Sequence, residues 1–565
     1  MSPSHFVVAY ICTIAAVMAS VAGLTTMARR ASRAARTAAA AESNNTRFFG
    51  SQVGGQSIIN YSYTDMPYRL MAFDAYYFFK FIWALPYIVF PLTPADSGEL
   101  SELAFTRKNM FSLAMHLVLC LLQLAFIVAL PLMALLPVWT AALAIGLFFL
   151  VNDLLCRLLN GSTVEYHSDP EYASALPEHG HEQWIFINGV AAGEHWMKSN
   201  LNRLALTFKR PILGIHNKTN GILFDVIECL IQRNLAYATT DVRVCYRIIK
   251  EKLYNPQYSK VVFILHSQGG IEGSLILDWL LQELPQNLLA KLEVYTFGNA
   301  SNHFNNPHRH IYSQDAAKRN PLAASTDSAN LAAARQVNGD FPSNHTTTEE
   351  PEDNISIAIP PPNLLTSETS ALSPSAISGR VIGHIEHYAH TSDFVALWGV
   401  LHFATSAPGT HSLPRYIGRV FARTSTRGGH QFVQHYLDGM FPLARDSATG
   451  KLIGCAEENE FMESEVVLGV AGDEERNHHL REIIDSDAVE VHSVSPVLQR
   501  RQPQSQRGRL RNRLEGSGGG SGAVVGVVKV KQLSRLWEYR NGRSPEEKPP
   551  LLPVDADGVV RMATM

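Results

Sequence analysis

The sequence predicts an α/β fold: a mostly parallel sheet with helices on both of its faces. Short apolar runs rich in β-branched residues alternate with segments whose apolar residues recur at helical spacing. Strands that alternate with helices in this way imply a parallel sheet covered by those helices. The predicted strands are 181–190, 211–217, 260–266, 291–299 and 381–391, and the predicted helices include 222–233, 242–253 and 271–281.

The run 260–266 ends abruptly at Ser267, and helical spacing begins directly after it. A strand-to-helix turn this tight leaves little room for side chains, and Gly269, Gly270 and Gly273 let the helix lie close to the strand. Such a turn would hold Ser267 up to a substrate, as a nucleophile elbow does. The alternative is a buried strand followed by an ordinary turn that contains glycine.

This stretch resembles the nucleophile elbow of the α/β-hydrolase fold, which usually reads G-x-S-x-G. Leu265 stands where the family has its first glycine, so its side chain must find space beside the following helix. The resemblance covers about 181–443 and is to lipase-like members in particular; similar membrane-bound hydrolases occur in fungi. It implies ester or related acyl hydrolysis through an acyl-serine intermediate, without a metal or an organic cofactor. The apolar segments described below make a lipid-like ester the expected substrate.

The same resemblance implies an oxyanion loop upstream of the serine. The segment 181–190 is a buried strand that ends in the turn Asn188-Gly189-Val190. The backbone N–H groups of Val190 and Gln268 would then face the developing oxyanion, and Gly189 would permit a close approach of the backbone. A strand end that merely turns is the alternative.

Asp393 is predicted to be the acid that orients a catalytic histidine. It follows the strand 381–391 directly, which is where α/β-hydrolases carry this residue. The run Asp393-Phe-Val is also similar to a segment of class 3 lipases. An aspartate here could equally cap a helix over 394–403, and the two roles are compatible. Asp438 and Glu386 are the next candidates for the acid.

His430 is predicted to be the catalytic histidine, because it comes last in the order serine, aspartate, histidine. It follows Gly428 and Gly429 and would lie in a loop at a helix start, from which it can reach Ser267. His435 is the second candidate, but it lies inside the predicted helix among apolar neighbours.

A membrane is the partner that the sequence indicates most strongly. Met110–Leu130 and Leu132–Leu155 form an almost unbroken apolar stretch, which predicts a transmembrane helical hairpin over 110–156. Basic residues lie at its open end, so the positive-inside bias places both ends, and the hydrolase domain, in the cytosol. The alternative is a buried pair of helices in a soluble core.

Two further segments have sequences that are typical of membrane contact or of targeting to an organelle. Residues 1–40 contain an apolar stretch and then arginines, with no acidic residue until Glu42. This is typical of an anchor whose N-terminus lies outside the cytosol, and also of a mitochondrial presequence, so an endomembrane such as the ER and the mitochondrion both stay open. The segment 70–95 is dense in aromatic residues around a charge, which suits a membrane interface or a surface-packed amphipathic helix of the hydrolase domain.

The net charge and the spacing of the cysteines and histidines argue against a nucleic-acid partner, a disulfide framework and a metal site. A net charge of −3 gives no reason to expect a nucleic acid as partner, and the six cysteines show no disulfide, redox or metal spacing. His384, His387 and His390 would scatter over both faces of a strand, so no metal site is predicted. A disordered insertion is predicted over 313–379, and a largely disordered tail over 457–565.

Two other functions stay open. A non-catalytic membrane scaffold could keep the hydrolase fold without turnover, and Leu265 is the best argument for it. An acyltransferase or a thioesterase would use the same three side chains as an esterase. The head group and the acyl chain of the lipid or acyl-ester substrate depend on pocket shape, which the sequence does not reveal.

Overall fold

The computed structural model describes residues 46–49, 66–309, 380–405, 416–468 and 529–545. The predicted anchor over 1–40 and the predicted insertion over 313–379 lie outside the described residues.

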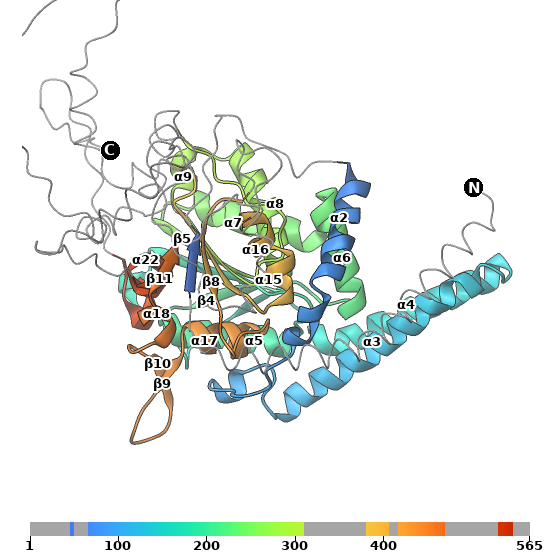
Figure 1. Ribbon diagram of the computed structural model, residues 1–565, viewed down its shortest axis with the longest axis horizontal. Helices are drawn as coiled ribbons and strands as arrows, with labels where there is room; N and C mark the ends of the chain where they lie inside the picture. The colour runs from blue at the N-terminus through green and yellow to red at the C-terminus, as the bar shows by residue number, and fades with distance from the viewer. Residues whose placement is uncertain (1–45, 50–65, 310–379, 406–415, 469–528, 546–565) are drawn as a thin grey trace, which may run out of the picture.

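A nine-stranded sheet forms the centre of the molecule (Figure 1). The strands from β4 to β8 in the sheet run parallel, while β2 and β1 pair antiparallel at the two ends of this block. The predicted α/β class and the mostly parallel sheet are therefore confirmed, and the arrangement is compatible with the α/β-hydrolase fold. The strands, in sheet order, are β11 (Val466–Leu468), β1 (Thr46–Phe49), β8 (Arg419–Arg423), β7 (His384–His390), β6 (Leu292–Phe297), β5 (Lys260–His266), β3 (Glu182–Ile187), β4 (Ile212–Ile215) and β2 (Glu165–His167).

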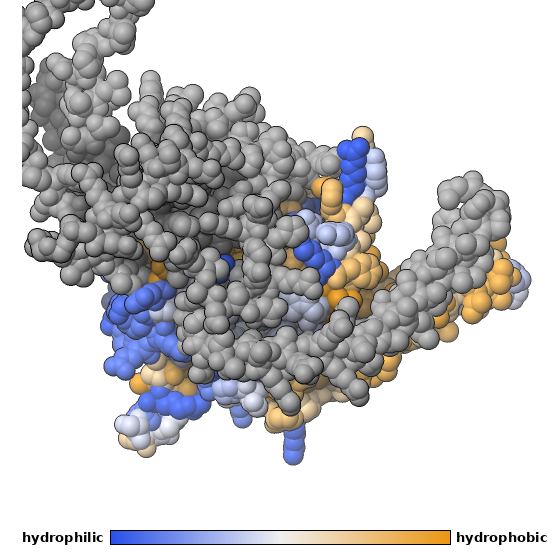
Figure 2. Space-filling model, viewed as in Figure 1, coloured by the Kyte–Doolittle hydropathy of each residue, from blue (hydrophilic) through white to orange (hydrophobic). Residues whose placement is uncertain are grey.

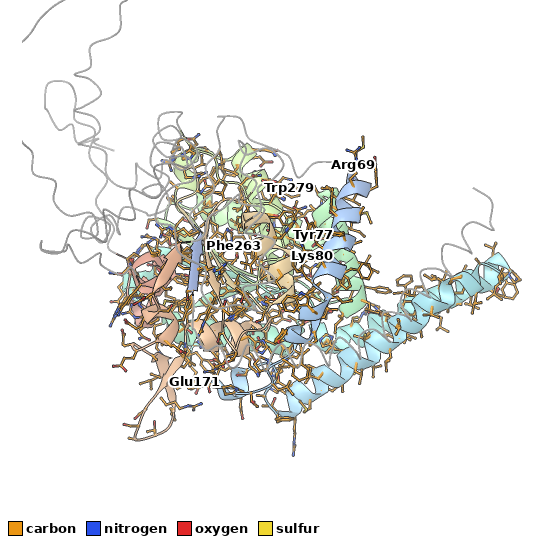
Figure 3. The ribbon with its side chains drawn as sticks, in the orientation of Figure 1. Arg69, Tyr77, Lys80, Glu171, Phe263 and Trp279 are labelled. Atoms are coloured by element: carbon orange, nitrogen blue, oxygen red, sulfur yellow. The ribbon has the colours of Figure 1, made fainter. Side chains whose placement is uncertain are left out.

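The strand β5 lies in the middle of the sheet and is buried along its whole length. Val261, Phe263 (Figure 3) and Leu265 pack into one hydrophobic layer, and Val262 and Ile264 pack into the opposite one. This alternation is the period-two geometry of a strand. Burial on both faces explains why the strand reads as a continuous apolar run instead of an alternating one.

Helices cover both faces of the sheet. One face carries α7 (Thr240–Tyr254), α8 (Gln268–Glu283), α9 (Gln286–Leu289), α15 (Phe394–Trp398), α16 (Val400–Thr405) and the 3-10 helix η2 (Ile82–Ile88). The other carries α5 (Glu194–Phe208), the π-helix η6 (Phe432–Leu437), α17 (Asp438–Met440), α18 (Glu460–Glu463), α22 (Val530–Leu533) and α23 (Arg535–Glu538). The outer elements are α2 (Pro67–Lys80), α6 (Ile222–Leu235), the short turns η3 (Gly98–Leu100), η4 (Pro177–His179) and η9 (Arg540–Gly542), and the hairpin β9 (Leu443–Arg445) and β10 (Leu452–Cys455).

Two long apolar helices, α3 (Arg107–Met133) and α4 (Val138–Asn160), project from the domain as an antiparallel pair (Figure 1). Each is long and apolar enough to cross a membrane. Only 22% of the most apolar window of α3 and 17% of that of α4 are buried, so the pair does not form the core of a soluble domain.

The folded unit is larger than the predicted limits 181–443. The sheet gains β2, β1 and β11 from outside these limits, and residues 529–545, which belong to the predicted disordered tail, pack on the core. Within this last segment Leu536, Trp537 and Tyr539 are buried. The tail predicted to be largely disordered thus contains two ordered stretches, 457–468 and 529–545, because a few large apolar residues in a short segment can complete a core that the rest of the chain has built.

Candidate active site

Ser267 lies between β5 and α8 in a backbone conformation that few residues adopt. Its φ of 56° and ψ of −119° make it one of the few residues with positive φ among the described non-glycine residues. Such a conformation costs on the order of 1 to 3 kcal/mol and persists only when its surroundings impose it. Here the Ser267 N–H donates to the Phe297 carbonyl at 3.1 Å, and the Ser267 carbonyl accepts from the Gly270 and Ala300 N–H groups. The tight strand-to-helix turn predicted from the sequence is therefore present, and its backbone is strained at Ser267.

Leu265 is accommodated in the turn, although the α/β-hydrolase pattern has glycine at this position. Its side chain is fully buried, and its methyl groups occupy the space that a Cβ on Gly273 would need. Gly273 lies on the second turn of α8. The room for the larger side chain thus comes from the facing helix, so the departure at Leu265 leaves the serine turn intact.

The structure brings Ser267, His430 and Asp393 together, although Ser267 and His430 are 163 residues apart in the sequence. His430 Nε2 lies 2.9 Å from Ser267 Oγ, and His430 Nδ1 lies 2.9 Å from Asp393 Oδ2. A carboxylate only accepts hydrogen bonds, so Nδ1 carries the proton and Nε2 is left to accept from the serine hydroxyl. This is the tautomer in which a histidine can take a proton from serine.

Asp393 is fully buried and is surrounded by three donors. Its Oδ1 accepts from the Val395 N–H at 2.8 Å, and its Oδ2 accepts from both His430 and the Tyr436 hydroxyl, the latter at 2.6 Å. The two roles considered for Asp393, helix cap and histidine partner, therefore coexist in one carboxylate. Burial and the neighbouring Asp393 raise the pKa of Tyr436 well above its usual range, so its hydroxyl stays a donor.

The loop that carries His430 is held by a distant segment of the chain. The His430 N–H donates to the Tyr87 carbonyl at 3.0 Å, and the Gln431 side chain donates to the Ile88 carbonyl at 2.8 Å. His435 Nε2 lies 2.8 Å from the Pro91 carbonyl, which explains why this second candidate histidine does not reach the serine. Part of the predicted segment 70–95 thus packs on the domain and positions the histidine loop.

His266, which the sequence did not single out, lies between the strand and the histidine loop. Its ring stacks on that of His430 at 4.8 Å, and its Nε2 lies 2.9 Å from the His430 carbonyl. Because a carbonyl only accepts, this nitrogen is the donor and carries the proton. Burial, with the nearby His430, lowers the pKa of His266 to about 3. His266 is therefore neutral and adds no positive charge beside His430.

The loop after β3, which the sequence analysis proposed as the oxyanion loop, lies against Ser267. A Cβ on Gly189 would come within 2.5 Å of the Ser267 Cβ, so only glycine allows this approach. The Val190 side chain packs against Cys229, Ile271 and Ala300. Gln268 is the first residue of α8, so its N–H has no acceptor within the helix. Both backbone amides therefore belong to the two segments that flank the serine.

Two buried side chains fix the loop that contains Val190. Asn188 bonds through both ends of its amide to the backbone of Asn217, at 2.8 and 2.9 Å. Asp225 accepts from the Ala191 N–H at 3.1 Å and from the Thr219 hydroxyl at 2.6 Å. Burial raises the pKa of Asp225 to about 6. These contacts tie the loop to the segment between β4 and α6.

The other candidates for the acid lie in different surroundings. Asp438 accepts from Ser97 and pairs with Arg203 at 3.3 Å, and Glu386 lies 2.7 Å from His384. Neither is bonded to His430. Among the described residues, no group of three or more histidine, cysteine, aspartate or glutamate side chains is arranged to hold a metal ion.

Comparisons of the chain with models of protein families, with curated proteins and with solved structures found no match in any of the three. A function for the chain therefore has to be argued from the geometry of the site.

Proposed function

We propose that the protein is a membrane-bound serine hydrolase of the α/β-hydrolase type that cleaves a lipid-like carboxylic ester. The observation that carries the proposal is the continuous chain of hydrogen bonds from Ser267 through His430 to Asp393, with both links at 2.9 Å. An unassisted serine hydroxyl is a poor nucleophile at neutral pH, and a histidine placed in this way activates it. The strained backbone of Ser267 supports the same role, because strain of this kind clusters at functional sites.

In the proposed reaction, Ser267 Oγ forms a bond to the acyl carbon of the ester while His430 Nε2 takes the hydroxyl proton. The backbone N–H groups of Val190 and Gln268 stabilise the resulting oxyanion. The C–O bond to the alcohol then breaks, and His430 gives its proton to the leaving oxygen. Water attacks the acyl-serine with His430 again as base, which releases the acid and restores Ser267. Asp393 stabilises the transient imidazolium throughout.

The polarity of the α3–α4 hairpin supports attachment to a membrane. The side of α3 that faces the domain carries Asn109, Ser112, His116 and Gln123 among its buried residues, whereas its outward side is apolar and exposed. This is the reverse of a helix on a soluble protein, which buries its apolar stripe. In Figure 2, apolar residues are visible at the far end and along the lower edge of the hairpin. Arg107, Lys108 and Arg157 lie at the base of the hairpin, and the positive-inside bias makes them an argument for a domain on the cytosolic side.

The main alternative function is a catalytically inactive scaffold. The strongest argument for it is Leu265, which stands where the α/β-hydrolase pattern has glycine. The argument weakens because Gly273 supplies the space that Leu265 needs. A scaffold would also have no reason to keep Ser267, His430 and Asp393 in hydrogen-bonding geometry.

Labelling with a fluorophosphonate, which reacts with activated serines, tests the proposal. Membranes that contain the full chain should be labelled, and Ser267→Ala should abolish the labelling. Ser274→Ala is the matched control, because Ser274 is also buried on α8 and its hydroxyl donates to the Ile271 carbonyl of the same helix. Labelling that persists in the Ser267→Ala variant would rule out the assignment. Hydrolysis of long-chain esters in mixed micelles, compared with matched thioesters, then defines the substrate class.

A further inference from the structure

The segment 216–221 joins β4 to α6 and bonds both to the oxyanion loop, residues 188–193, and to the α3–α4 hairpin. It forms neither a helix nor a strand, so the side chains that bond to its backbone determine its conformation. Asn188 and Asp225 of the domain are two of these side chains. The hairpin supplies others, which are Gln123 from α3 and Asn152 and Asn160 from α4.

Asn160, the last residue of α4, binds both backbone groups of Thr219. Its Nδ2 donates to the Thr219 carbonyl at 2.7 Å, and its Oδ1 accepts from the Thr219 N–H at 3.0 Å. The Thr219 hydroxyl donates to Asp225 at 2.6 Å, and Asp225 accepts from the Ala191 N–H at 3.1 Å. Ala191 directly follows Val190 in the chain. A continuous chain of hydrogen bonds therefore runs from α4 to the neighbour of a proposed oxyanion donor.

Gln123 and Asn152 bind the next part of the same segment. Their side chains both donate to the Asn220 carbonyl, at 2.6 and 3.2 Å. The Gln123 Oε1 accepts at 3.2 Å from the N–H of Leu223, which lies in the first turn of α6 and has no acceptor within that helix. A Cβ on Gly221 would come within 2.1 Å of the Gln123 side chain, so this approach requires glycine. The helix α6 thus begins against the hairpin (Figure 1).

The oxyanion loop also touches the hairpin directly. A Cβ on Gly193 would come within 2.7 Å of the Leu159 carbonyl oxygen on α4, just as one on Gly189 would come within 2.5 Å of the Ser267 Cβ. The loop therefore spans from the serine to the hairpin. Between the two glycines Ala191 has a φ of 62°, a strained conformation that persists only when the surroundings impose it.

We infer that the hairpin, besides attaching the protein to a membrane, positions the oxyanion loop through Gln123, Asn152 and Asn160. These three are positioning residues, because they act on the Val190 N–H through the segment 216–221. The inference rests on the proposed function and deepens it, since it makes the membrane helices necessary for full turnover. An oxyanion donor acts fully only when it lies about 3 Å from the developing charge, so a loop released from the hairpin would stabilise the transition state less.

Asn160→Leu tests the inference, because leucine has a similar size and makes neither bond to Thr219. The full chain is purified in detergent micelles. Hydrolysis of a long-chain p-nitrophenyl ester is then measured per active site, counted by titration with a fluorophosphonate. The value of kcat should fall about tenfold while KM stays the same, since a displaced donor weakens binding of the transition state but not of the substrate. Gln123→Met should do the same through Asn220, and it keeps the test decisive if the first variant does not fold.

Thr140→Val is the matched control, because it removes from the same hairpin a hydroxyl that donates to the Pro137 carbonyl. Its kcat should equal that of the wild type. A thionoester, in which sulfur replaces the carbonyl oxygen, provides a second readout, because sulfur accepts hydrogen bonds only weakly. Asn160→Leu and Gln123→Met should therefore slow hydrolysis of the ester about tenfold more than hydrolysis of the thionoester.

An unchanged kcat in these two hairpin variants would overturn the inference, and so would an equal loss on the ester and the thionoester. Asn160→Leu is also combined with Asp225→Asn. The double variant should lose little more than Asp225→Asn alone, because both changes act along one chain of hydrogen bonds. Additive losses would again overturn the inference. A wild type that neither reacts with the fluorophosphonate nor hydrolyses the ester would instead overturn the proposed function.

Discussion

Two buried carboxylate–histidine pairs lie near opposite ends of β7, and they differ in what else surrounds them. Past the carboxyl end of the strand, Asp393 pairs with His430 at 2.9 Å, and His430 then meets Ser267. Near the amino end, Glu386 pairs with His384 at 2.7 Å. A pair of this kind is therefore not by itself a catalytic signature. The two pairs differ in the other groups that contact them. The first pair contacts the Ser267 hydroxyl, and the second belongs to a network of charged side chains.

The Glu386 pair belongs to a charge-balanced network that holds the C-terminal segment. Glu386 accepts from the Arg535 N–H at 2.7 Å and from the Tyr388 hydroxyl at 2.6 Å, and the Arg535 guanidinium pairs with Glu293 at 2.8 Å. Burial alone would raise the pKa of Glu386, but His384 and Arg419 lower it below its ordinary value. A carboxylate neutralised in this way stabilises structure, whereas Asp393 faces His430, and no arginine or lysine of the described residues forms an ion pair with it.

Asp393→Asn should produce the largest effect on turnover. The amide cannot hold the His430 tautomer or stabilise an imidazolium, so the rate of ester hydrolysis should fall by about a thousandfold or more. The midpoint of thermal unfolding should change little, since Asn can still cap α15. The two quantities are measured on the same detergent-solubilised protein. A rate within a few-fold of the wild type would show that the acid lies elsewhere.

Glu386→Gln should show the opposite pattern. Removing this charge leaves His384 and Arg419 buried without their carboxylate, which should lower the free energy of unfolding by about 3 kcal/mol. Hydrolysis per folded molecule should be unchanged, because the residue has no bond to His430. Thermal unfolding and active-site titration with a fluorophosphonate measure the two effects. A comparable loss of turnover in both variants would remove the distinction between the pairs.

Glu102 is a third buried carboxylate, and no arginine, lysine or histidine of the described residues forms an ion pair with it. It accepts from the Val433 and Gln434 N–H groups at the start of η6, and burial raises its pKa from 4.5 to about 7. The folded state therefore binds this proton more tightly than the unfolded state, and stability falls as the pH rises from about 4.5 to 7. Glu102→Gln should remove this loss, so the variant should gain on the order of 2 kcal/mol relative to the wild type between pH 5 and pH 8.

The difference between the thermal midpoints of Glu102→Gln and the wild type, taken at both pH values, checks this expectation. Only the change in that difference matters, so other titrating groups cancel. Glu171 (Figure 3) supplies the control, because Glu171→Gln removes a carboxylate that is exposed to water. A difference that does not vary with pH would show that Glu102 does not titrate in this range.

The predictable part of the site is the part that regular elements carry. Ser267 and Asp393 each follow a strand and His430 precedes a helix, so their positions could be predicted from local patterns and chain order. Tyr436 and His266 could not, since an aromatic residue in a helix and a histidine in a strand are ordinary core residues until their neighbours are known. The contacts of residues 87–92 with the histidine loop join positions more than 330 residues apart.

The fold, like the site, has a part that could be predicted from the sequence and a part that could not. The central parallel strands β3, β4, β5 and β6 were predictable because each carries its own apolar run. The packing of residues 529–545 was not, because Leu536, Trp537 and Tyr539 gain their burial from a surface that the distant strands create. Gly273 also had a second role that only the structure shows, in making room for Leu265. Contacts between segments far apart in the chain account for what the sequence alone did not reveal.

The smallest predicted effect comes from two tyrosines, and it gives the most direct comparison of the Asp393–His430 and Glu386–His384 pairs. Each carboxylate accepts a hydrogen bond from a tyrosine, and the two bonds have the same length. Tyr436 donates to Asp393 and Tyr388 donates to Glu386, both at 2.6 Å. A hydrogen bond to a charged group contributes about 1.5 to 3 kcal/mol, and 1.4 kcal/mol corresponds to a tenfold change in rate. Tyr436→Phe should therefore lower kcat about tenfold, because Asp393 is then held less firmly against His430, while KM stays the same. Tyr388→Phe should leave kcat unchanged and lower the thermal midpoint by a few degrees. Equal kinetic effects in the two variants would mean that loosened packing, and not the orientation of Asp393, sets the rate.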